Sequence, residues 1–159
     1  MFMEGLRVSR AERADYRALD ALFLRPVRKP EAIEFDSPSE TAAEEQKERH
    51  RQYARELVLK CADRNGRILA AIRGQVDEDT LYIKGLAVEP RYQGRGLAAL
   101  LVYHLEQRSG LKRFVVRTME TNTRHLAVYQ AALYKKTGVI DLDRGYKMVC
   151  LTKPAAAAG

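Results

Sequence analysis

The chain has 159 residues, of which 46% are hydrophobic and 31% charged, and it carries a net charge of +7. This length and balance predict a single globular domain over residues 1–153, and they exclude a chain that is disordered throughout. No run approaches the roughly 20 apolar residues of a membrane-spanning helix, so we expect no membrane partner. Residues 154–159, an alanine-rich end, are expected to be a disordered tail.

The cysteines and the first residues bear on the cellular compartment. Cys61 and Cys150 each lie in an apolar, strand-like run, and two cysteines do not supply a zinc site of the usual kind. We interpret both as reduced core residues, and we expect no bound metal. Glu4 and Gly5 lead into charge and not into an apolar leader segment. Together these features predict a cytoplasmic protein.

Positive charge is concentrated between Lys84 and Arg124, where eight Lys or Arg stand against three Glu. A basic region favours an anionic partner, whether nucleic acid, a membrane surface or a phosphorylated small molecule. A solvated basic face is the plainer interpretation of the charge excess alone.

The N-terminal half predicts a strand, two helices and an antiparallel meander. Residues 6–10 alternate as a strand does, and residues 11–24 place their apolar side chains near one helical face. Residues 39–55 are highly charged with a weak apolar face, which predicts a surface helix. Three strands are expected at 57–62, 68–76 and 81–88. The Asn65-Gly66 pair predicts a hairpin turn in which both residues have positive φ.

The C-terminal half predicts helices and strands in alternation. A helix is expected to begin near Gly94 or Arg95 and to end at Ser109-Gly110, before a strand over 114–118. The strand–helix–strand unit over residues 81–118 should be parallel.

A further helix should run from Asn122 or Thr123 to Lys136, with Gly138 as its C-cap, before a last strand over 146–151. The element order is then β-α-α-β-β-β-α-β-α-β. It predicts an α/β (α+β) fold with a mixed central sheet, made of an antiparallel N-terminal meander and a parallel β-α-β unit.

The most informative stretch covers residues 86–98, where a strand ends, a short loop turns, and a helix begins at Gly-Arg-Gly. A helix N-terminus presents free N–H groups and partial positive charge, and glycines let a phosphate approach the backbone. Arg91 and Arg95 add positive charge at the same point. The stretch therefore predicts a cradle for a pyrophosphate.

Two common phosphate loops do not fit this stretch. A Walker loop needs Gly-Lys-Ser/Thr at the helix start, which Gly94-Arg95-Gly96-Leu97 does not supply. Gly94, Gly96 and Ala99 match a dinucleotide fingerprint in form. However, five residues separate the strand from Gly94, and too few residues follow to complete a doubly wound sheet.

A third interpretation rests on resemblance. Gln93-x-x-Gly96-x-Ala98 follows Val88-Glu89-Pro90, and this segment resembles motif A of the GCN5-related N-acetyltransferase (GNAT) family. That signature is Gln/Arg-x-x-Gly-x-Gly/Ala after a strand ending in Val-x-Pro. The order of the elements also resembles the GNAT fold over nearly the whole chain.

A second family signal, Asn-x6-Tyr after the fifth strand, is matched by Asn122 and Tyr129. The resemblance implies acetyl transfer from acetyl-CoA to a small-molecule or peptide primary amine by direct attack. It implies that acetyl-CoA binds at Leu86, Ala87, Val88, Gln93, Gly94, Arg95, Gly96, Leu97, Ala98, Asn122 and Tyr129. A backbone N–H near Val88 would stabilise the charge on the thioester oxygen.

One departure from the family concerns the catalytic acid. The family often reads Tyr-x-x-x-Gly-Phe, but here Tyr129 is followed by Gln-Ala-Ala-Leu, and the Tyr-x-x-x-Gly spacing recurs from Tyr134 to Gly138. On a continuous helix Tyr129 and Tyr134 would lie on different faces. We assign the acid that protonates the leaving thiolate to Tyr129 because of its spacing from Asn122. Tyr134 stays as the alternative.

The general base has no clear candidate. Family members often carry a Glu on the fourth strand, which has no carboxylate here. Glu120 is a weak candidate that we interpret as a surface charge. His125 follows Asn122 by one helical turn and could reach the cleft.

Two other functions compete with an enzyme. A CoA-binding module that lost catalysis would keep motif A and serve as a regulator or interaction partner. A nucleic-acid-binding domain would interleave aromatic residues with the basic stretch, where few occur, so we expect no nucleic acid. The resemblance also allows a homodimer, although no sequence feature shows one.

The acceptor site should be formed by residues 25–38, 39–55 and 139–146, which carry no sequence motif that identifies the acceptor. The acidic residues on that side mildly favour a cationic amine, although they could equally be a solvated face: Glu31, Glu34, Asp36, Glu40, Glu44 and Glu45.

Overall fold

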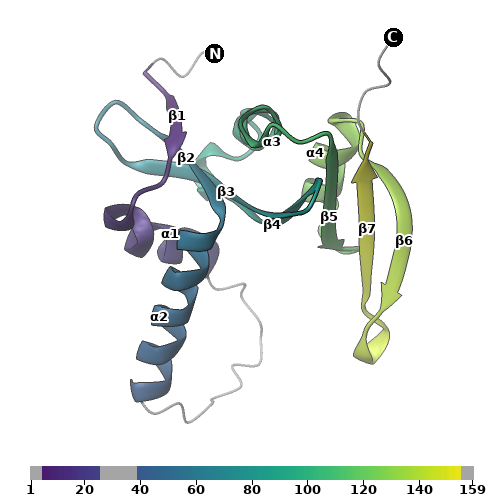
Figure 1. Cartoon of the computed structure of the whole chain (residues 1–159), viewed down its shortest axis with the longest axis horizontal. Helices are drawn as coiled ribbons and strands as arrows, with labels where there is room; N and C mark the ends of the chain where they lie inside the picture. The colour runs from purple at the N-terminus through teal and green to yellow at the C-terminus, as the bar shows by residue number, and fades with distance from the viewer. Residues whose placement is uncertain (1–4, 26–38, 155–159) are drawn as a thin grey trace.

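The computed structural model describes residues 5–25 and 39–154, and within that range it leaves out the side chains of residues 39–41. The expected tail and most of the 25–38 loop lie outside the described residues. The described elements follow in the order β1 (Arg7–Arg10), α1 (Tyr16–Phe23), α2 (Ser39–Arg55), β2 (Leu57–Ala62), β3 (Ile68–Asp77), β4 (Thr80–Val88), α3 (Leu97–Ser109), β5 (Arg113–Met119), α4 (Thr123–Ala131), β6 (Lys135–Asp141) and β7 (Lys147–Lys153) (Figure 1).

These strands form one mixed sheet in the order β1-β2-β3-β4-β5-β7-β6. All neighbouring pairs are antiparallel except β4 and β5, which are parallel because α3 crosses between them. The predicted meander, the parallel unit and the α/β class with a mixed sheet are therefore confirmed. None of the described helices is both long and apolar enough to span a membrane.

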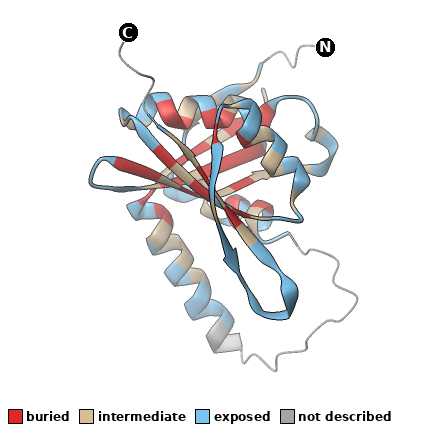
Figure 2. Cartoon of the chain, turned by 90° about the vertical axis from the view of Figure 1, so that its right-hand side faces the viewer, coloured by how far each residue is buried: buried red, intermediate tan, exposed pale blue. Residues whose placement is uncertain are grey.

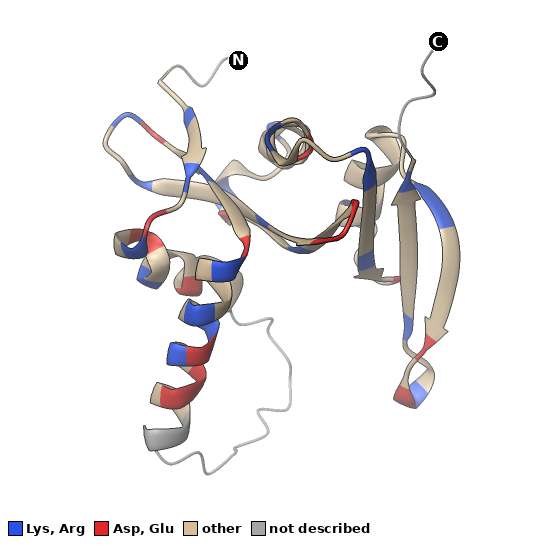
Figure 3. Cartoon of the chain, in the orientation of Figure 1, with Lys and Arg blue, Asp and Glu red and all other residues tan. Residues whose placement is uncertain are grey.

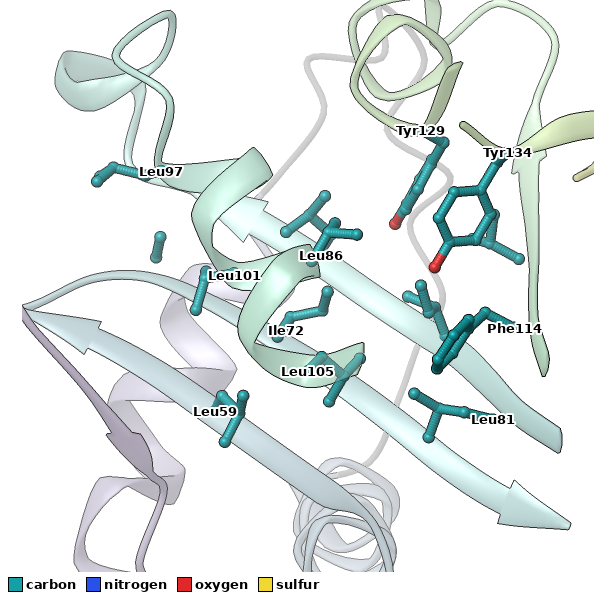
Figure 4. Close-up of a cluster of buried hydrophobic side chains, with 14 of the residues drawn as sticks. Leu59, Ile72, Leu81, Leu86, Leu97, Leu101, Leu105, Phe114, Tyr129 and Tyr134 are labelled. Carbon is teal, nitrogen blue, oxygen red and sulfur yellow. The ribbon is translucent and has the colours of Figure 1, made fainter. Parts of the chain in front are cut away.

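Helices cover the two faces of the sheet. The larger core lies under α3, where Leu101 and Leu105 pack on Leu59, Ile72 and Leu81, all fully buried (Figure 4). A smaller core lies on the opposite face, and its buried residues are Leu19, Leu22, Tyr53, Val58 and Ala71. Because β5 has only its α3-facing residues buried, the other face of the sheet is open beside β4 and β5.

The second helix contacts the body of the protein at its C-terminal end. Among its described side chains only Tyr53 is buried, and most of the helix is exposed, which confirms the expected surface helix (Figure 2). The contact with α1 is polar. Asp20, 7% exposed, accepts hydrogen bonds from Tyr53 Oη at 2.8 Å and Arg49 Nε at 3.1 Å, and its Oδ2 lies 2.7 Å from His50 Nε2.

The turn between β2 and β3 differs from the expected one. Gly66 has φ 83°, but Asn65 does not have positive φ. Gly66 N–H donates to the Asp63 carbonyl, and the Asp63 carboxylate accepts from the N–H groups of Asn65 and Arg67, both at 2.9 Å. The predicted hairpin is therefore present, but the Asp63 side chain stabilises its turn and only Gly66 is left-handed.

The predicted helix from residue 123 to 136 is wrong at its C-terminal end. The helix α4 ends at Ala131, and residues 135–141 form β6, an additional strand at the edge of the sheet. Gly138 lies in that strand at an irregularity of its pairing with β7, so it is not a C-cap. The sequence did not predict this strand, because its side chains are almost all exposed and apolar residues therefore do not alternate with polar ones.

The chain changes direction between α4 and β6 at Leu133, which has φ 75° and is 71% exposed. Relative to Tyr129, this is the Gly position of the Tyr-x-x-x-Gly-Phe pattern, and Tyr134 takes the place of the Phe. The left-handed conformation is the reason for a glycine there, because a Cβ disfavours it. The pattern is thus present from Tyr129 with two substitutions.

The Asp20 cluster makes stability depend on pH. Burial raises the pKa of Asp20, but hydrogen bonds from Arg49, Tyr53 and His50 outweigh it and lower the pKa from 3.8 to about 2. The ionised carboxylate therefore stabilises the fold above pH 4, and the contribution is lost as the pH falls from about 4 to about 2. We expect Asp20→Asn to lower the free energy of unfolding at pH 7 by about 2 kcal/mol and to flatten its decline below pH 4 in urea titrations. Parallel pH profiles for the two proteins would contradict this.

Replacing Leu133 tests the strain at the end of α4. Leu133→Gly should raise the free energy of unfolding by about 0.5–1 kcal/mol, because relief of the left-handed strain exceeds the entropy that glycine adds to the unfolded chain. Leu133→Ala is the matched control, since it keeps a Cβ at the same φ and loses only exposed surface. Thermal denaturation should show a higher Tm for the glycine variant alone, and an equal gain with alanine would contradict the explanation.

Candidate active site

The parallel strands β4 and β5 separate partway along their length. They pair at four positions, ending with Ile83 opposite Val116, after which β4 continues to Val88 and β5 to Met119 without pairing with each other. A cleft of about 360 Å³ occupies this split, and residues 83–87 and 116–119 line its two sides. The split therefore exposes the backbone edges of two central strands inside the sheet.

A bulge in β4 accompanies the separation. Arg73 of β3 is opposite Gly85, whereas Gly74 is opposite Ile83, so Lys84 is the extra residue. A bulge bends its strand and increases the local twist, and here it comes directly after the last pair with β5. A side chain at Gly85 would be tightly packed, because a Cβ there would lie 3.3 Å from Cε1 of Phe23, a side chain of the cleft wall.

Beyond the bulge, Val88 turns one edge of its backbone away from β3. The N–H of Glu89 donates to the Leu69 carbonyl of β3 at 2.8 Å, so the Val88 groups point in the opposite direction. The Val88 carbonyl instead accepts from Gln93 Nε2 at 3.2 Å. The N–H of Val88 lies on the same edge, where a developing negative charge could receive a hydrogen bond.

The loop after β4 leads into the N-terminus of α3. The helix begins at Leu97, later than the expected start near Gly94 or Arg95, because Gly94 and Gly96 have φ 77° and 84° and Gly96 is the N-cap. A second hollow of about 260 Å³ lies there, lined by Val88, Gln93, Gly94, Gly96, Leu97 and Ala98 among others. The first turn of α3 has no acidic residue, so its free N–H groups can bind an anion.

Arg124 of α4 closes the other side of this second hollow, and sequence reasoning did not single it out. Its guanidinium donates to Oε1 of Gln93, so Gln93 joins the end of β4 to the start of α4. Its position two residues after Asn122, in the first turn of the helix, is the signal that could have identified it. Arg95, by contrast, lines neither hollow, and its guanidinium lies 5.1 Å from the centre of the Tyr92 ring.

Asn122, one of the two expected caps, is the N-cap of α4, and it orients His125. Its Oδ1 accepts the backbone N–H of His125 at 3.2 Å, which leaves Nδ2 to donate to His125 Nδ1 at 3.0 Å. The proton of a neutral His125 is therefore on Nε2. Burial and the charge of Arg124 lower the pKa of His125, so the ring is neutral at pH 7. His125 lines both hollows and connects them.

Tyr129 and Tyr134 have different environments, although their ring centres are 5.4 Å apart (Figure 4). Tyr129 is 2% exposed and lines the split, and its phenol makes no hydrogen bond with any described residue. Tyr134 donates its phenol to Glu106 Oε2 at 2.7 Å, and Lys153 donates to Oε1 of the same carboxylate at 2.8 Å. Burial raises the pKa of both phenols, and Glu106 raises that of Tyr134 further.

The opposite wall of the cleft contains a buried ion pair. Arg73 donates Nε and Nη2 to the fully buried Glu56 carboxylate at 2.7 and 3.0 Å. Its guanidinium also lies 4.9 Å from the centre of the Tyr53 ring and 5.5 Å from that of Phe23. Arg73 is thereby fixed and neutralised in the wall.

The structure gathers most of the predicted site residues around the split and the adjoining hollow. Leu86, Ala87, Asn122 and Tyr129 line the split, and the six others named above line the hollow. Glu120 is exposed and lines neither, and the same is true of Glu44 and Glu45 on α2. Residues 31–36 lie outside the described residues. A larger depression, about 710 Å³, is at the opposite end of β5, and none of the predicted residues lines it.

Comparison with known proteins agrees with this geometry. Residues 21–133 match the acetyltransferase (GNAT) family, and this range covers most of the chain. The chain belongs to the GNAT family. It is thus an acyltransferase of the acetyl-CoA-dependent class, which confirms the fold and enzyme class expected from the sequence.

Solved structures share the fold at low sequence identity. The ribosomal-protein-S18-alanine N-acetyltransferase of Escherichia coli is 23% identical, with a TM-score of 0.69 over 97% of this chain and 96% of that one. A spermidine N-acetyltransferase SpeG mutant of Vibrio cholerae is 17% identical, with a TM-score of 0.70 over 94% and 93%. The putative acetyltransferase yncA of Salmonella typhimurium, solved with acetyl-CoA, is 17% identical, with a TM-score of 0.70 over 98% and 97%.

Proposed function

We propose that this protein transfers an acetyl group from acetyl-CoA to a primary amine by direct attack in a ternary complex. The observation that carries the proposal is that the split between β4 and β5 adjoins the hollow at the N-terminus of α3, with His125 lining both. An anion site and a site for a reacting acyl group are thereby adjacent. Relatives of this fold act on amines of a ribosomal protein and of spermidine, which supports an amine acceptor.

The second hollow suits the pyrophosphate of CoA. A Cβ added at Gly94 or Gly96 would meet no atom within 4 Å, so the absence of side chains leaves open space next to the free N–H groups of α3. Arg124 supplies a positive charge from the facing helix. Gln93 and Ala98 complete the lining. In this arrangement Leu86, Ala87 and Val88 offer the edge of β4 to the pantetheine arm.

Acetyl-CoA supplies the acetyl group as a thioester, and the acceptor nitrogen attacks its carbonyl carbon, so that a C–N bond forms as the C–S bond breaks. The N–H of Val88 is the donor that we assign to the carbonyl oxygen as negative charge develops there. The side chain of Asn122 caps α4 and also contacts the ring of His125. We therefore assign it the positioning of His125, in addition to the expected contact with pantetheine.

Tyr129 is the residue that we assign to the leaving sulfur. The raised pKa keeps its phenol protonated across the neutral range, so the donor is always present. A thiol has a pKa of roughly 8.5, below that of the phenol, so complete proton transfer from Tyr129 would be uphill. Tyr129 therefore acts mainly by donating a hydrogen bond to the sulfur, and solvent supplies the proton in the end.

Deprotonation of the amine does not involve a carboxylate of the described cleft lining, because none is present there. We therefore assign this step to water at the open mouth of the cleft. The amine must be neutral to attack, so the rate should follow the fraction of unprotonated acceptor as the pH rises.

A glycine variant with a matched control tests the cofactor site. Gly96→Ala should abolish most of the rise in Tm that acetyl-CoA produces, because the methyl group would occupy the proposed pyrophosphate space. Gly66→Ala introduces a Cβ at nearly the same positive φ, also with no atom within 4 Å, but in the β2–β3 turn. Both variants should lose similar intrinsic stability, and only Gly96→Ala should lose the response to acetyl-CoA. Full retention of that response by Gly96→Ala would refute the site.

Separate tyrosine variants test the role of Tyr129. Tyr129→Phe should lower kcat about 100-fold with little change in acetyl-CoA affinity, because only stabilisation of the leaving sulfur is lost. Tyr134→Phe should leave kcat within about twofold but lower the Tm, since it removes one donor from the buried Glu106. Normal turnover by Tyr129→Phe would remove our assignment. Binding of acetyl-CoA without transfer to any amine by the unaltered protein would instead identify the silent CoA-binding module.

A further inference from the structure

The open face of the sheet continues the cleft as a groove. Besides the split itself, a second depression of about 410 Å³ lies beside it, and the two share Ile83, Lys84, Arg117 and Met148 in their linings. Side chains alternate along a strand, and Leu81 and Val116 point into the core under α3. The groove therefore lies on the opposite face, beside α1, where an acceptor can reach the split.

Positive charge dominates the part of this groove nearest the split. The described lining of the split contains Arg73, Lys84 and Arg117 and no carboxylate. Arg73 is neutralised by Glu56, whereas neither Lys84 nor Arg117 forms an ion pair with any described residue. In Figure 3 the ribbons of β4 and β5 are blue at their Lys and Arg positions.

Lys84 and Arg117 occupy matching positions on the two strands. Each follows directly the last paired residues, Ile83 and Val116, so the two cations flank the split at the point where it opens. Both are exposed and both line the same two depressions. Like charges on neighbouring strands repel each other and destabilise a sheet. Lys84 is the bulged residue of β4, and it faces Arg117 across the split. A bound anion would offset the repulsion.

The sign of the charge changes along the groove. Its other end is lined by Asp77, the last residue of β3. This separation of charge would orient a bound acceptor, with its negative group near the split and any positive group away from it.

We infer that the acceptor is an amine that also carries an anionic group, a carboxylate or a phosphate, bound between Lys84 and Arg117. The inference rests on the proposed function, because it names the substrate class of the same cleft. The planar guanidinium of Arg117 suits two oxygens of one anion, and Lys84 adds a point charge from the other strand. It replaces the cationic acceptor that the acidic residues of the sequence mildly favoured.

Matched pairs of acceptors test the inference. Initial rates of CoA release would be measured for L-amino acids against their carboxamides, and for aminoalkyl phosphates against the corresponding amino alcohols, with spermidine as a cationic reference. We expect at least one anionic class to have kcat/KM tenfold or more above its neutral partner. The anion raises the pKa of the amine and lowers its neutral fraction, so the reactivity of the amine alone would favour the neutral partner.

Variants of β4 and β5 test whether Lys84 and Arg117 cause the preference for anionic acceptors. Lys84→Gln and Arg117→Gln should each raise KM for the anionic acceptor about tenfold or more and leave the rise in Tm with acetyl-CoA unchanged. Arg113→Gln is the matched control, because Arg113 lies on the same strand and the same face but lines neither depression. Arg117→Glu should move the preference toward spermidine.

Each outcome separates the two proposals. If the protein does not bind acetyl-CoA, the proposed function fails. If it binds acetyl-CoA but acetylates only neutral or cationic amines, or none of the anionic members, the inference is wrong while the cofactor site stands. The same holds if anionic acceptors are used but Lys84→Gln and Arg117→Gln change KM no more than Arg113→Gln does.

Discussion

The interruption of pairing between β4 and β5 is the constraint on which the site depends. Four paired positions hold the strands together, and a single extra residue, Lys84, turns β4 away beyond them. Without this bulge the strands would continue side by side, their backbone groups would satisfy one another, and no donor at Val88 would be available to a ligand. The break in the sheet thus supplies both the cleft and its hydrogen-bonding groups.

The basic character of the central part of the chain follows from this geometry. Arg124 lies on the side of the split toward α3, where a pyrophosphate is proposed, and Lys84 and Arg117 lie on the opposite face. One excess of positive charge in the sequence is therefore distributed over two surfaces, to which we assign different ligands. The acidic groups near the cleft are instead used internally, as Glu56 is by Arg73 and Asp20 by α2.

Much of this could be predicted from the sequence where local patterns are strong. The meander follows from alternating strands, and the loop before α3 from its glycines and the residues around them. The end of α4 could not be predicted, because Leu133 has a conformation that favours glycine, and β6 presents an exposed surface without alternation. The hydrogen bond of Tyr134 to Glu106 could not be predicted either, because the two residues are 28 positions apart and only the tertiary fold brings them together.

The carboxylate of Glu106 has a mechanical consequence for the cleft. It lies on α3, which packs against β2, β3 and β4, yet its partners Tyr134 and Lys153 belong to the β6–β7 side of the split. Because Lys153 is opposite Phe114, which lies in the paired part of β4 and β5, these charge-assisted bonds reinforce the closed end of the split. The closed end of the cleft is therefore held both within the sheet and from the α3 face, so a ligand that reaches it does not have to order this part of the protein.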